Sequence, residues 1–296
     1  MTRNLRGLAL LPSETIRDFP PNFSSKQMHA GLYFNKYANA WQWENEAKSD
    51  SKLSFNKSDW LKSFVSQCNP VGHKQALETY TQRIEHLVAA RGGMTLRLKT
   101  VERFVTGLGL PHPVENGFLW HHSLGVPYLP GTAVKGILRA QLEADTESQI
   151  DDETFLRLFG SPRRTDSAAR ENDTAGKAAE TATAETENEK DTASMQRGAL
   201  LCFDAPPTIP VRLELDIMTP HYGPYYHAGD IPGDWHSPNP VTFLTVAPET
   251  EFIFSFAPYK STGIDIELEE LSRVLRIALD YFGAGAKTAA GYGRFL

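Results

Sequence analysis

Residues 127–139 read PYLPGTAVKGILR, a turn that passes into a helix. Pro130-Gly131 ends the extended chain before it, and Thr132 is a candidate N-cap. Apolar residues then recur at the spacing of one helix face, namely Val134, Ile137, Leu138 and Leu142. Lys135 and Arg139, four residues apart, share another side of the same helix. The stretch therefore predicts an amphipathic helix with one buried face and a basic flank.

Strand-like segments lie on both sides of this helix, and several of them alternate apolar with charged side chains, as a half-buried strand does. The expected strands are 94–105, 211–218, 241–246 and 251–256, the last two as a further pair. Residues 268–282 predict a second amphipathic helix that ends at Gly283, followed by a glycine-rich loop and a short terminal strand. This order predicts an α+β fold with a ferredoxin-like β-α-β-β-α-β core that carries insertions.

The chain is expected to divide near residue 93. Residues 1–93 have their own character and include a regular helix that Gly92-Gly93 closes. They predict a largely helical N-terminal extension, and residues 94–296 predict the ferredoxin-like domain. Within that domain, residues 165–194 hold eight acids against three bases and almost no large apolar side chain. Such a composition predicts a disordered acidic loop on the surface.

Net charge by itself argues against a nucleic-acid partner, because the chain carries −6. The acidic loop supplies most of that charge, however, so that the remaining chain is close to neutral and local basic patches decide the matter. Only two cysteines occur, in no metal or redox spacing, and the N-terminus has only a short apolar run. We expect a cytoplasmic protein with free thiols and no membrane partner.

Two segments are candidates for binding phosphate. The N-terminus of the helix at Gly131 can attract an anion, and Lys135 and Arg139 lie just beyond it. The glycine-rich loop at 283–293 can expose backbone amides, with Lys287 and Arg294 adding charge that no nearby acid opposes. We expect the two segments to meet as one cationic surface. The alternatives are an ordinary capped core helix and a tight turn built from glycine.

Nucleotide and metal sites are not expected. Ala286 stands where a P-loop needs glycine, and the loop follows a helix instead of joining a strand to a helix. The histidines include no convincing set of metal ligands, so that neither a metal nor another cofactor is predicted. His221 and Tyr222 lie in a long segment rich in histidine and aromatic residues, which can either stack on unpaired bases or pack on its own domain.

Three motifs carry a resemblance to a known family. They are PGTAVKG at 130–136, DIMTPHY at 216–222, and GAGAKT at 283–288 with GYG at 291–293. Together they resemble the RAMP proteins of type III-B (Cmr) CRISPR effector complexes, and the likeness extends from about residue 103 to the C-terminus. The first ninety residues and the acidic loop contribute no motif to it.

The resemblance implies a RAMP domain, RRM-like in its core, that binds RNA without cutting it. Its expected partners are the guide RNA near its 3′ end, the target RNA and other Cmr-type subunits in a hetero-oligomer. The residues that match the family and are expected to contact RNA are Lys135, Arg139, Gly285, Lys287, Thr288, Gly291, Arg294, His221 and Tyr222.

Two other functions remain open from the sequence. The first is a metal-independent endoribonuclease that matures precursor RNA, with His221 or His122 as the general base and Lys287 stabilising the transition state. The second is a scaffold that contacts only protein.

Overall fold

A three-stranded antiparallel sheet lies at the centre of the computed structural model, which describes residues 29–38, 41–44, 52–145, 150–161, 197–219, 229, 231, 238–259 and 268–296. Its strand order is β3 (Met94–Lys99), β7 (Glu251–Pro258) and β4 (Leu200–Cys202). The middle strand, β7, reads EFIFSFAP and is buried along almost its whole length. A continuous apolar run of this kind fits a strand that is covered on both faces.

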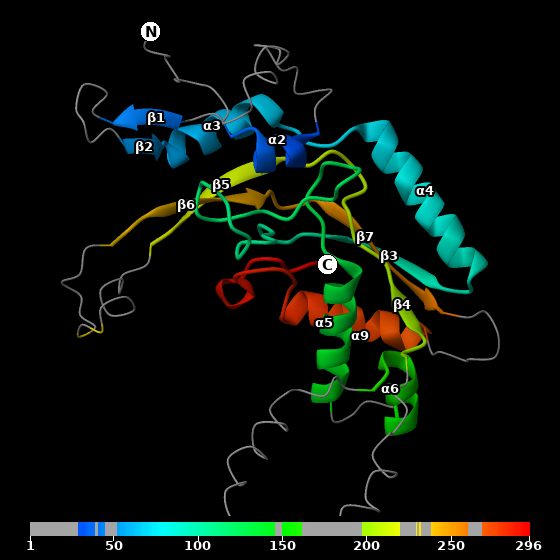
Figure 1. Ribbon diagram of the computed structural model, residues 1–296. Coiled ribbons are helices and arrows are strands. Elements are labelled where there is room, and N and C mark those ends of the chain that lie inside the picture. The colour runs from blue at the N-terminus through cyan, green and yellow to red at the C-terminus, as the bar shows by residue number, and fades with distance from the viewer. Residues whose placement is uncertain are drawn as a thin grey trace, which may run out of the picture.

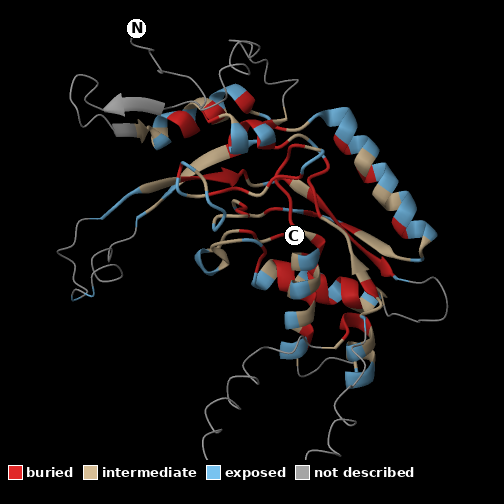
Figure 2. Cartoon of the chain, viewed as in Figure 1, coloured by how far each residue is buried: buried red, intermediate tan, exposed pale blue. Residues whose placement is uncertain are grey.

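Helices cover both faces of this sheet (Figure 1). α4 (Lys74–Ala90) packs on β3 and β7 from one side, where Arg97 of β3 forms an ion pair of 2.7 Å with Glu85. On the other side, α5 (Gly131–Ala144) lies across α9 (Leu268–Tyr281) and contacts β4. Figure 2 shows that the buried residues concentrate between these layers.

The end of the chain returns to the edge of the sheet beside β3. Phe295 forms an antiparallel bridge with Thr100, and the amide and carbonyl groups of Leu296 and Lys99 exchange hydrogen bonds of 2.9 and 2.7 Å. The predicted terminal strand is therefore present only as this bridge. Along the sheet, the order of segments is the C-terminus, β3, β7 and β4.

A second antiparallel pair joins β5 (Leu213–Met218) to β6 (Val241–Val246), and α3 (Lys57–Cys68) packs against both strands. The shorter elements are α2 (Ala30–Lys36), β1 (Trp41–Glu44) paired with β2 (Lys52–Phe55), and α6 (Asp152–Phe159). Residues of α2 and α3 form an aromatic cluster with Trp120, which includes Tyr33, Phe34, Trp60 and Phe64.

The two helices and four strands predicted from Met94 onward are all present, but several details were wrong. β3 ends at Lys99 instead of residue 105, because the Thr100 amide turns to the Thr250 carbonyl. β6 and β7 do not pair with each other, since β6 pairs with β5 while β7 lies between β3 and β4.

Two apolar side chains near the ends of these elements are exposed. Phe282 is 63% exposed, because α9 ends one residue earlier and Gly283 turns the chain with a φ of +72°. Ile217 is 60% exposed on β5.

One apolar cluster includes residues of α2 and α3 as well as the sheet and its helices. A boundary at residue 93 therefore stays a prediction, and the acidic loop 165–194 lies outside the described residues. Cys68 and Cys202 are free thiols, as predicted. None of the helices that the structure describes is long and apolar enough to cross a membrane.

Candidate nucleic-acid interface

The C-terminal loop, residues 283–293, holds Lys287 in an unusual backbone conformation. Lys287 has a φ of +59° and begins the short 3-10 helix η1 (Thr288–Ala290), after which Gly291 has a φ of +89°. The Lys287 ammonium lies 5.4 Å from the ring centroid of Phe243 and 5.9 Å from that of Tyr292. No described carboxylate forms an ion pair with it, so that Lys287 contributes an unneutralised positive charge.

The backbone of this loop also presents hydrogen-bond donors. The amides of Ala290 and Gly291 bond back to the carbonyls of Lys287 and Thr288 and close the turn. Among the described residues, the amides of Lys287, Thr288 and Ala289 have no acceptor. Successive amides of this kind form a concavity that suits an anion, and the Lys287 ammonium lies on the same residue.

The glycines of the loop have different roles. At Gly285, with a φ of +90°, an added Cβ would overlap the carbonyl oxygen of Val105, and at Gly293 it would overlap that of Ala284. These two glycines are required by the packing of the loop on its own domain. At Gly291 an added Cβ would meet nothing within 4 Å, so that this side of the loop is open.

Two acidic side chains beside the loop, Glu214 and Asp216, accept hydrogen bonds from Arg103 and Tyr292. Arg103 donates to Glu214 at 2.9 Å and to Asp216 at 3.0 Å, and the Tyr292 hydroxyl donates to Asp216 at 2.6 Å. Burial alone would raise the pKa of Asp216, but these hydrogen bonds outweigh it and lower the pKa. Burial and the neighbouring Asp216 raise the pKa of Tyr292 to about 12.

A cleft of about 370 Å³ runs along Arg103, Gly291 and Tyr292, beside the C-terminal loop.

The expectation that no acid opposes Arg294 was wrong. Its guanidinium donates to both the backbone carbonyl and a carboxylate oxygen of Asp280, each at 2.6 Å. Asp280 lies on α9, fourteen residues earlier in the chain, and its charge offsets that of Arg294. Arg294 therefore ties the chain end to α9, whereas Lys287 stays unpaired among the described residues.

The basic residues of α5 lie against α6 and β4. Lys135 donates to the Leu200 carbonyl at 2.7 Å, and Arg139 donates to Glu143 at 2.9 Å. Burial lowers the pKa of Lys135, and the positive charges of Arg197 and Arg139 add to that effect.

The N-terminus of α5 already has an anionic partner. Asp204 accepts a hydrogen bond of 2.8 Å from the Gly131 amide, and Pro130 occupies the N-cap position, so that the prediction of Thr132 as cap was wrong. Gly131 is buried, and an added Cβ would overlap the Cys202 carbonyl oxygen. The chain therefore supplies its own carboxylate where the sequence predicted a phosphate.

The candidate residues thus fall into separate groups. Lys287, Thr288 and Gly291 belong to the C-terminal loop, while Lys135 and Arg139 lie at the junction of α5 with α6. No hydrogen bond or ring contact among the described residues joins the two groups, so that a single shared surface stays a prediction. His221 and Tyr222 lie outside the described residues.

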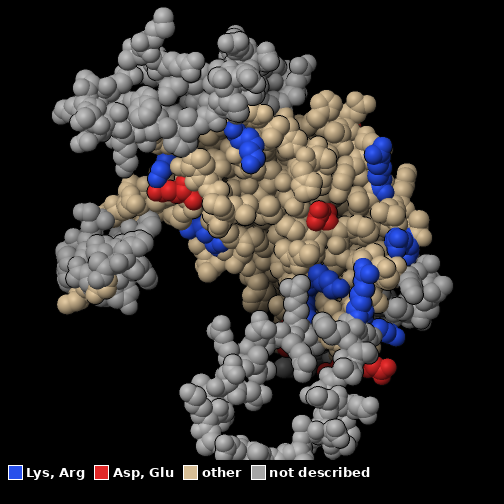
Figure 3. Space-filling view, in the orientation of Figure 1, with Lys and Arg blue, Asp and Glu red and all other residues tan. Residues whose placement is uncertain are grey.

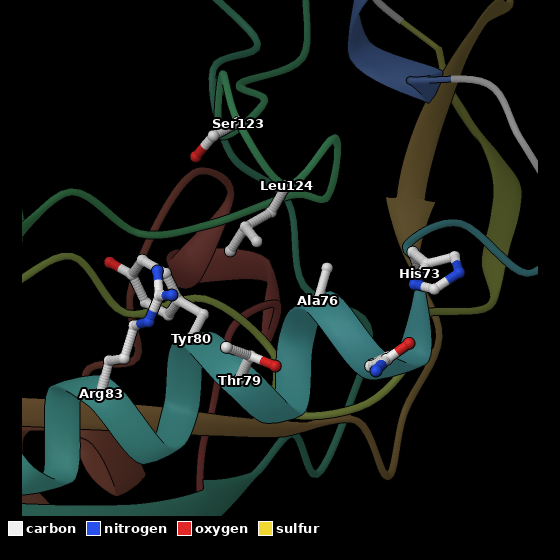
Figure 4. A pocket seen from close by; sticks show the side chains of 8 residues that line it. His73, Ala76, Thr79, Tyr80, Arg83, Ser123 and Leu124 are labelled. Atoms are coloured by element: carbon white, nitrogen blue, oxygen red, sulfur yellow. The ribbon is translucent and has the colours of Figure 1, made fainter.

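A further cleft, of about 450 Å³, opens between α4 and residues 123–124 (Figure 4). Tyr80 and Arg83, one helical turn apart, line it together with Thr79, Ser123 and Leu124. The neighbouring His121 is buried, which lowers its pKa, and its Nδ1 faces the amide and hydroxyl of Ser123. Within the described residues, no group of three or more His, Cys, Asp or Glu side chains could hold a metal ion.

Basic side chains are unevenly distributed over the surface. On the face drawn in Figure 3, Lys and Arg outnumber Asp and Glu and gather over the region of α5 and β4. Sequence reasoning missed Arg103 and Arg197 as members of such groups. Both arginines lie near the ends of strand-like segments, which does not indicate a contact partner. They could not be assigned because their partners lie more than sixty residues away in the sequence.

The chain is similar to proteins of the RAMP superfamily and to a CRISPR subunit. The sequence profile of the RAMP superfamily matches residues 97–194. The CRISPR system Cmr subunit Cmr6 of Pyrococcus furiosus is 31% identical over 275 residues, an alignment that spans 76% of this chain and 72% of that protein.

A cryo-EM structure of the type III-B Cmr-beta complex bound to cognate target RNA contains a chain with 18% identity and a TM-score of 0.56, covering 81% of this chain and 70% of that one. At that identity the match supports a common fold alone. The crystal structure of Pyrococcus furiosus Cmr6 is 29% identical over 69% of this chain and 96% of that chain, with a TM-score of 0.36.

Proposed function

The chain belongs to the RAMP superfamily, in the family of the CRISPR subunit Cmr6, and on that premise we propose that it is an RNA-binding structural subunit of a type III-B effector complex. The observation that carries the proposal is the 31% identity to Cmr6, which extends over three quarters of the chain. Its partners are then the guide RNA in its 3′ region, the target RNA and neighbouring Cmr-type subunits. The same premise makes it a cytoplasmic protein.

The C-terminal loop is the part of the chain that we assign to the RNA backbone. The Lys287 ammonium and the amides of residues 287–289 offer positive charge and hydrogen-bond donors on one open turn. Phosphate oxygens are the ligands that such a turn accepts, and contacts of this type supply most of the affinity of a protein for nucleic acid. Thr288 belongs to this turn and Gly291 ends it, and Gly291 leaves room for close approach. Lys135 and Arg139 remain further candidates, each half-buried.

The core that presents this loop is ferredoxin-like in our proposal. The segment order C-terminus, β3, β7, β4 supports it, as does the alternation β3, α5, β4, β7, α9 and C-terminal bridge along the chain. Both α5 and α9 lie on the same side of the sheet. The domain would then start at residue 94, with the preceding helices as an extension on the opposite side.

We infer a non-catalytic role from the same premise, the relationship to Cmr6. In the alternative, an endoribonuclease needs a histidine base within reach of the Lys287 site. No hydrogen bond or ring contact among the described residues joins His122 to Lys287, and His221 lies outside the described residues. Incubation of the purified protein with labelled repeat RNA in EDTA tests this directly. We expect intact RNA, and specific cleavage that His221→Ala abolishes would favour the enzyme.

The decisive experiment for RNA binding is purification of the complex through this subunit, with quantification of the guide RNA that is retained. We expect Lys287→Glu to reduce retention, because it reverses the one charge of the loop that no described acid balances. Lys62→Glu makes the same charge change on an exposed residue of α3, which lies on the other side of the β5–β6 pair from the C-terminal loop, and should retain RNA fully. Equal RNA retention in both variants would favour a scaffold that contacts only protein.

A further inference from the structure

One corner of the molecule, remote in sequence from the C-terminal loop, alternates cations with aromatic rings. Three cation–ring contacts meet there: Arg197 on Tyr259 at 4.0 Å from the ring centroid, Lys135 on Phe159 at 5.9 Å, and Arg139 on Phe155 at 5.5 Å. These six residues and Arg157 are called the cation–aromatic corner below. Figure 3 shows Lys and Arg side chains gathered over this region.

The backbone fixes the corner firmly. Arg197 forms a bridge with Gly160 at the end of α6, and the Ala199 amide donates to the Arg157 carbonyl at 2.8 Å. The Tyr259 amide in turn donates to the Ala199 carbonyl at 2.7 Å. The end of α6, the start of β4 and the end of β7 are therefore hydrogen-bonded together, which sets the positions of Arg157, Arg197 and Tyr259 before any ligand arrives.

The cations of the corner are only partly balanced by carboxylates of the described residues. Arg139 is paired with Glu143, and Asp151 lies within electrostatic range of Arg157, but no described carboxylate forms an ion pair with Lys135 or Arg197. In addition, Arg157 Nε is buried and has no hydrogen-bond partner within the part of the chain that the structure describes. Like charges held together and an orphan buried donor both destabilise a protein that lacks a ligand. A bound polyanion would offset the repulsion between these like charges.

The aromatic rings identify the class of polyanion. Tyr259 is 39% exposed, with the Arg197 guanidinium against its ring and its carbonyl bound to Arg91 at 3.0 Å. Aromatic rings and guanidinium planes are the surfaces on which unpaired bases stack, and neighbouring cations follow the phosphates. An acidic protein surface would use the cations and leave the exposed ring without a function.

We propose that the cation–aromatic corner is a second contact for single-stranded RNA, in which Arg157 and Arg197 hold phosphates and the Tyr259–Arg197 pair stacks a base. The proposal rests on the function proposed above, that this chain binds RNA. It adds a binding site that lies at the junction of α6, β4 and β7, separate from the Lys287 loop.

The test measures the dissociation constant of the full-length protein for a labelled single-stranded RNA of mixed sequence over a range of salt concentrations. Arg197→Gln should weaken binding about fivefold or more and reduce the magnitude of the slope of log K against log salt by about 0.7 for each phosphate contact that is lost. Tyr259→Leu should weaken binding about fivefold or more with the slope unchanged, because stacking releases no counterions. Tyr259→Phe keeps the ring and should bind as the unaltered protein does.

Lys62→Gln on α3 is the matched control for loss of one exposed charge and should leave affinity and slope unchanged. Unchanged affinity in both Arg197→Gln and Tyr259→Leu, with weaker binding in Lys287→Ala, would overturn this proposal while the proposed function stands. Absence of RNA binding by the unaltered protein would overturn both. If Arg197→Gln instead releases a neighbouring subunit from the complex and keeps its RNA affinity, the corner is a protein interface and the proposal is wrong.

Discussion

Tyr292 donates a hydrogen bond of 2.6 Å to the carboxylate of Asp216, and this contact joins the C-terminal loop to β5. Arg103 approaches the same carboxylate at 3.0 Å. The loop that carries Lys287 is therefore held against the β5–β6 pair by a group that is far away in sequence. Because the bond involves a carboxylate whose pKa is lowered, its strength depends on pH.

The first prediction concerns that pH dependence. The folded state lowers the pKa of Asp216, so this residue adds stability above its ordinary pKa and loses that contribution as pH falls through the folded value. Tyr292→Phe should lower the melting temperature at neutral pH, and the difference from the unaltered protein should narrow below about pH 4. Thermal unfolding from pH 3 to 7 measures it. Tyr281→Phe, at a site 76% exposed, is the control and should leave the melting temperature unchanged. If Tyr292→Phe lowers the melting temperature by the same amount at every pH, the prediction is wrong.

The second prediction separates the charge of Lys287 from its backbone conformation. Lys287 has a φ of +59°, a region that glycine adopts without steric cost. Lys287→Gly should therefore keep the free energy of unfolding within about 1 kcal/mol, since relief of strain offsets the lost ring contacts and the added chain entropy. RNA affinity should fall about as far as in Lys287→Ala. Retained affinity in both variants would show that the charge does not bind RNA.

The elements that the sequence predicted well are those set by local periodicity. The helices at 131–144 and 268–281 follow from apolar residues such as Val134, Leu138 and Leu275, which repeat within a single segment. The pairing of strands was harder to predict from the sequence, because the partners of β5 and β7 are selected by the packing of the whole sheet. The assignment of β6 to β5 instead of β7 is a relationship of this kind.

The candidate site shows the same limit. Lys287 was predicted from a local motif, whereas the acid partner of Arg294 lies on the preceding helix and that of Gly131 lies at residue 204. Such contacts span 14 and 73 residues and leave no trace in local composition. The contact of Arg197 with Tyr259 likewise requires β4 and β7 to be neighbours, which only the fold provides.

The third prediction compares two glycines of the C-terminal loop. Gly285→Ala forces a Cβ toward the Val105 carbonyl at a φ of +90°, so that it should destabilise the protein by about 2 kcal/mol or more. Gly291→Ala has the same backbone problem at a φ of +89° but an open side, and should destabilise by only about 1 kcal/mol. Chemical denaturation gives both values. If RNA approaches Gly291 closely, Gly291→Ala also weakens RNA binding in protein that is still folded. An equal loss of stability in the two variants would contradict the packing described for Gly285.

The fourth prediction concerns the acidic segment. Deleting residues 165–194 should leave folding and assembly intact, because the segment contains almost no large apolar side chain that could belong to a core. The melting temperature of the deletion variant and its recovery in the purified complex measure the two properties. Insoluble protein, or loss of the subunit from the complex, would contradict the prediction.

The last prediction tests the N-terminus of α5. Asp204→Ala removes the acceptor of the Gly131 amide and should destabilise the protein by about 1 kcal/mol, whereas Asp204→Asn keeps an acceptor oxygen and should recover most of that loss. Both variants also remove a negative charge beside this helix end. If the Gly131 turn contacted RNA phosphate, RNA affinity would rise in both. We expect it to stay constant, because Gly131 is buried against the end of β4, and a rise would restore the turn to the RNA interface.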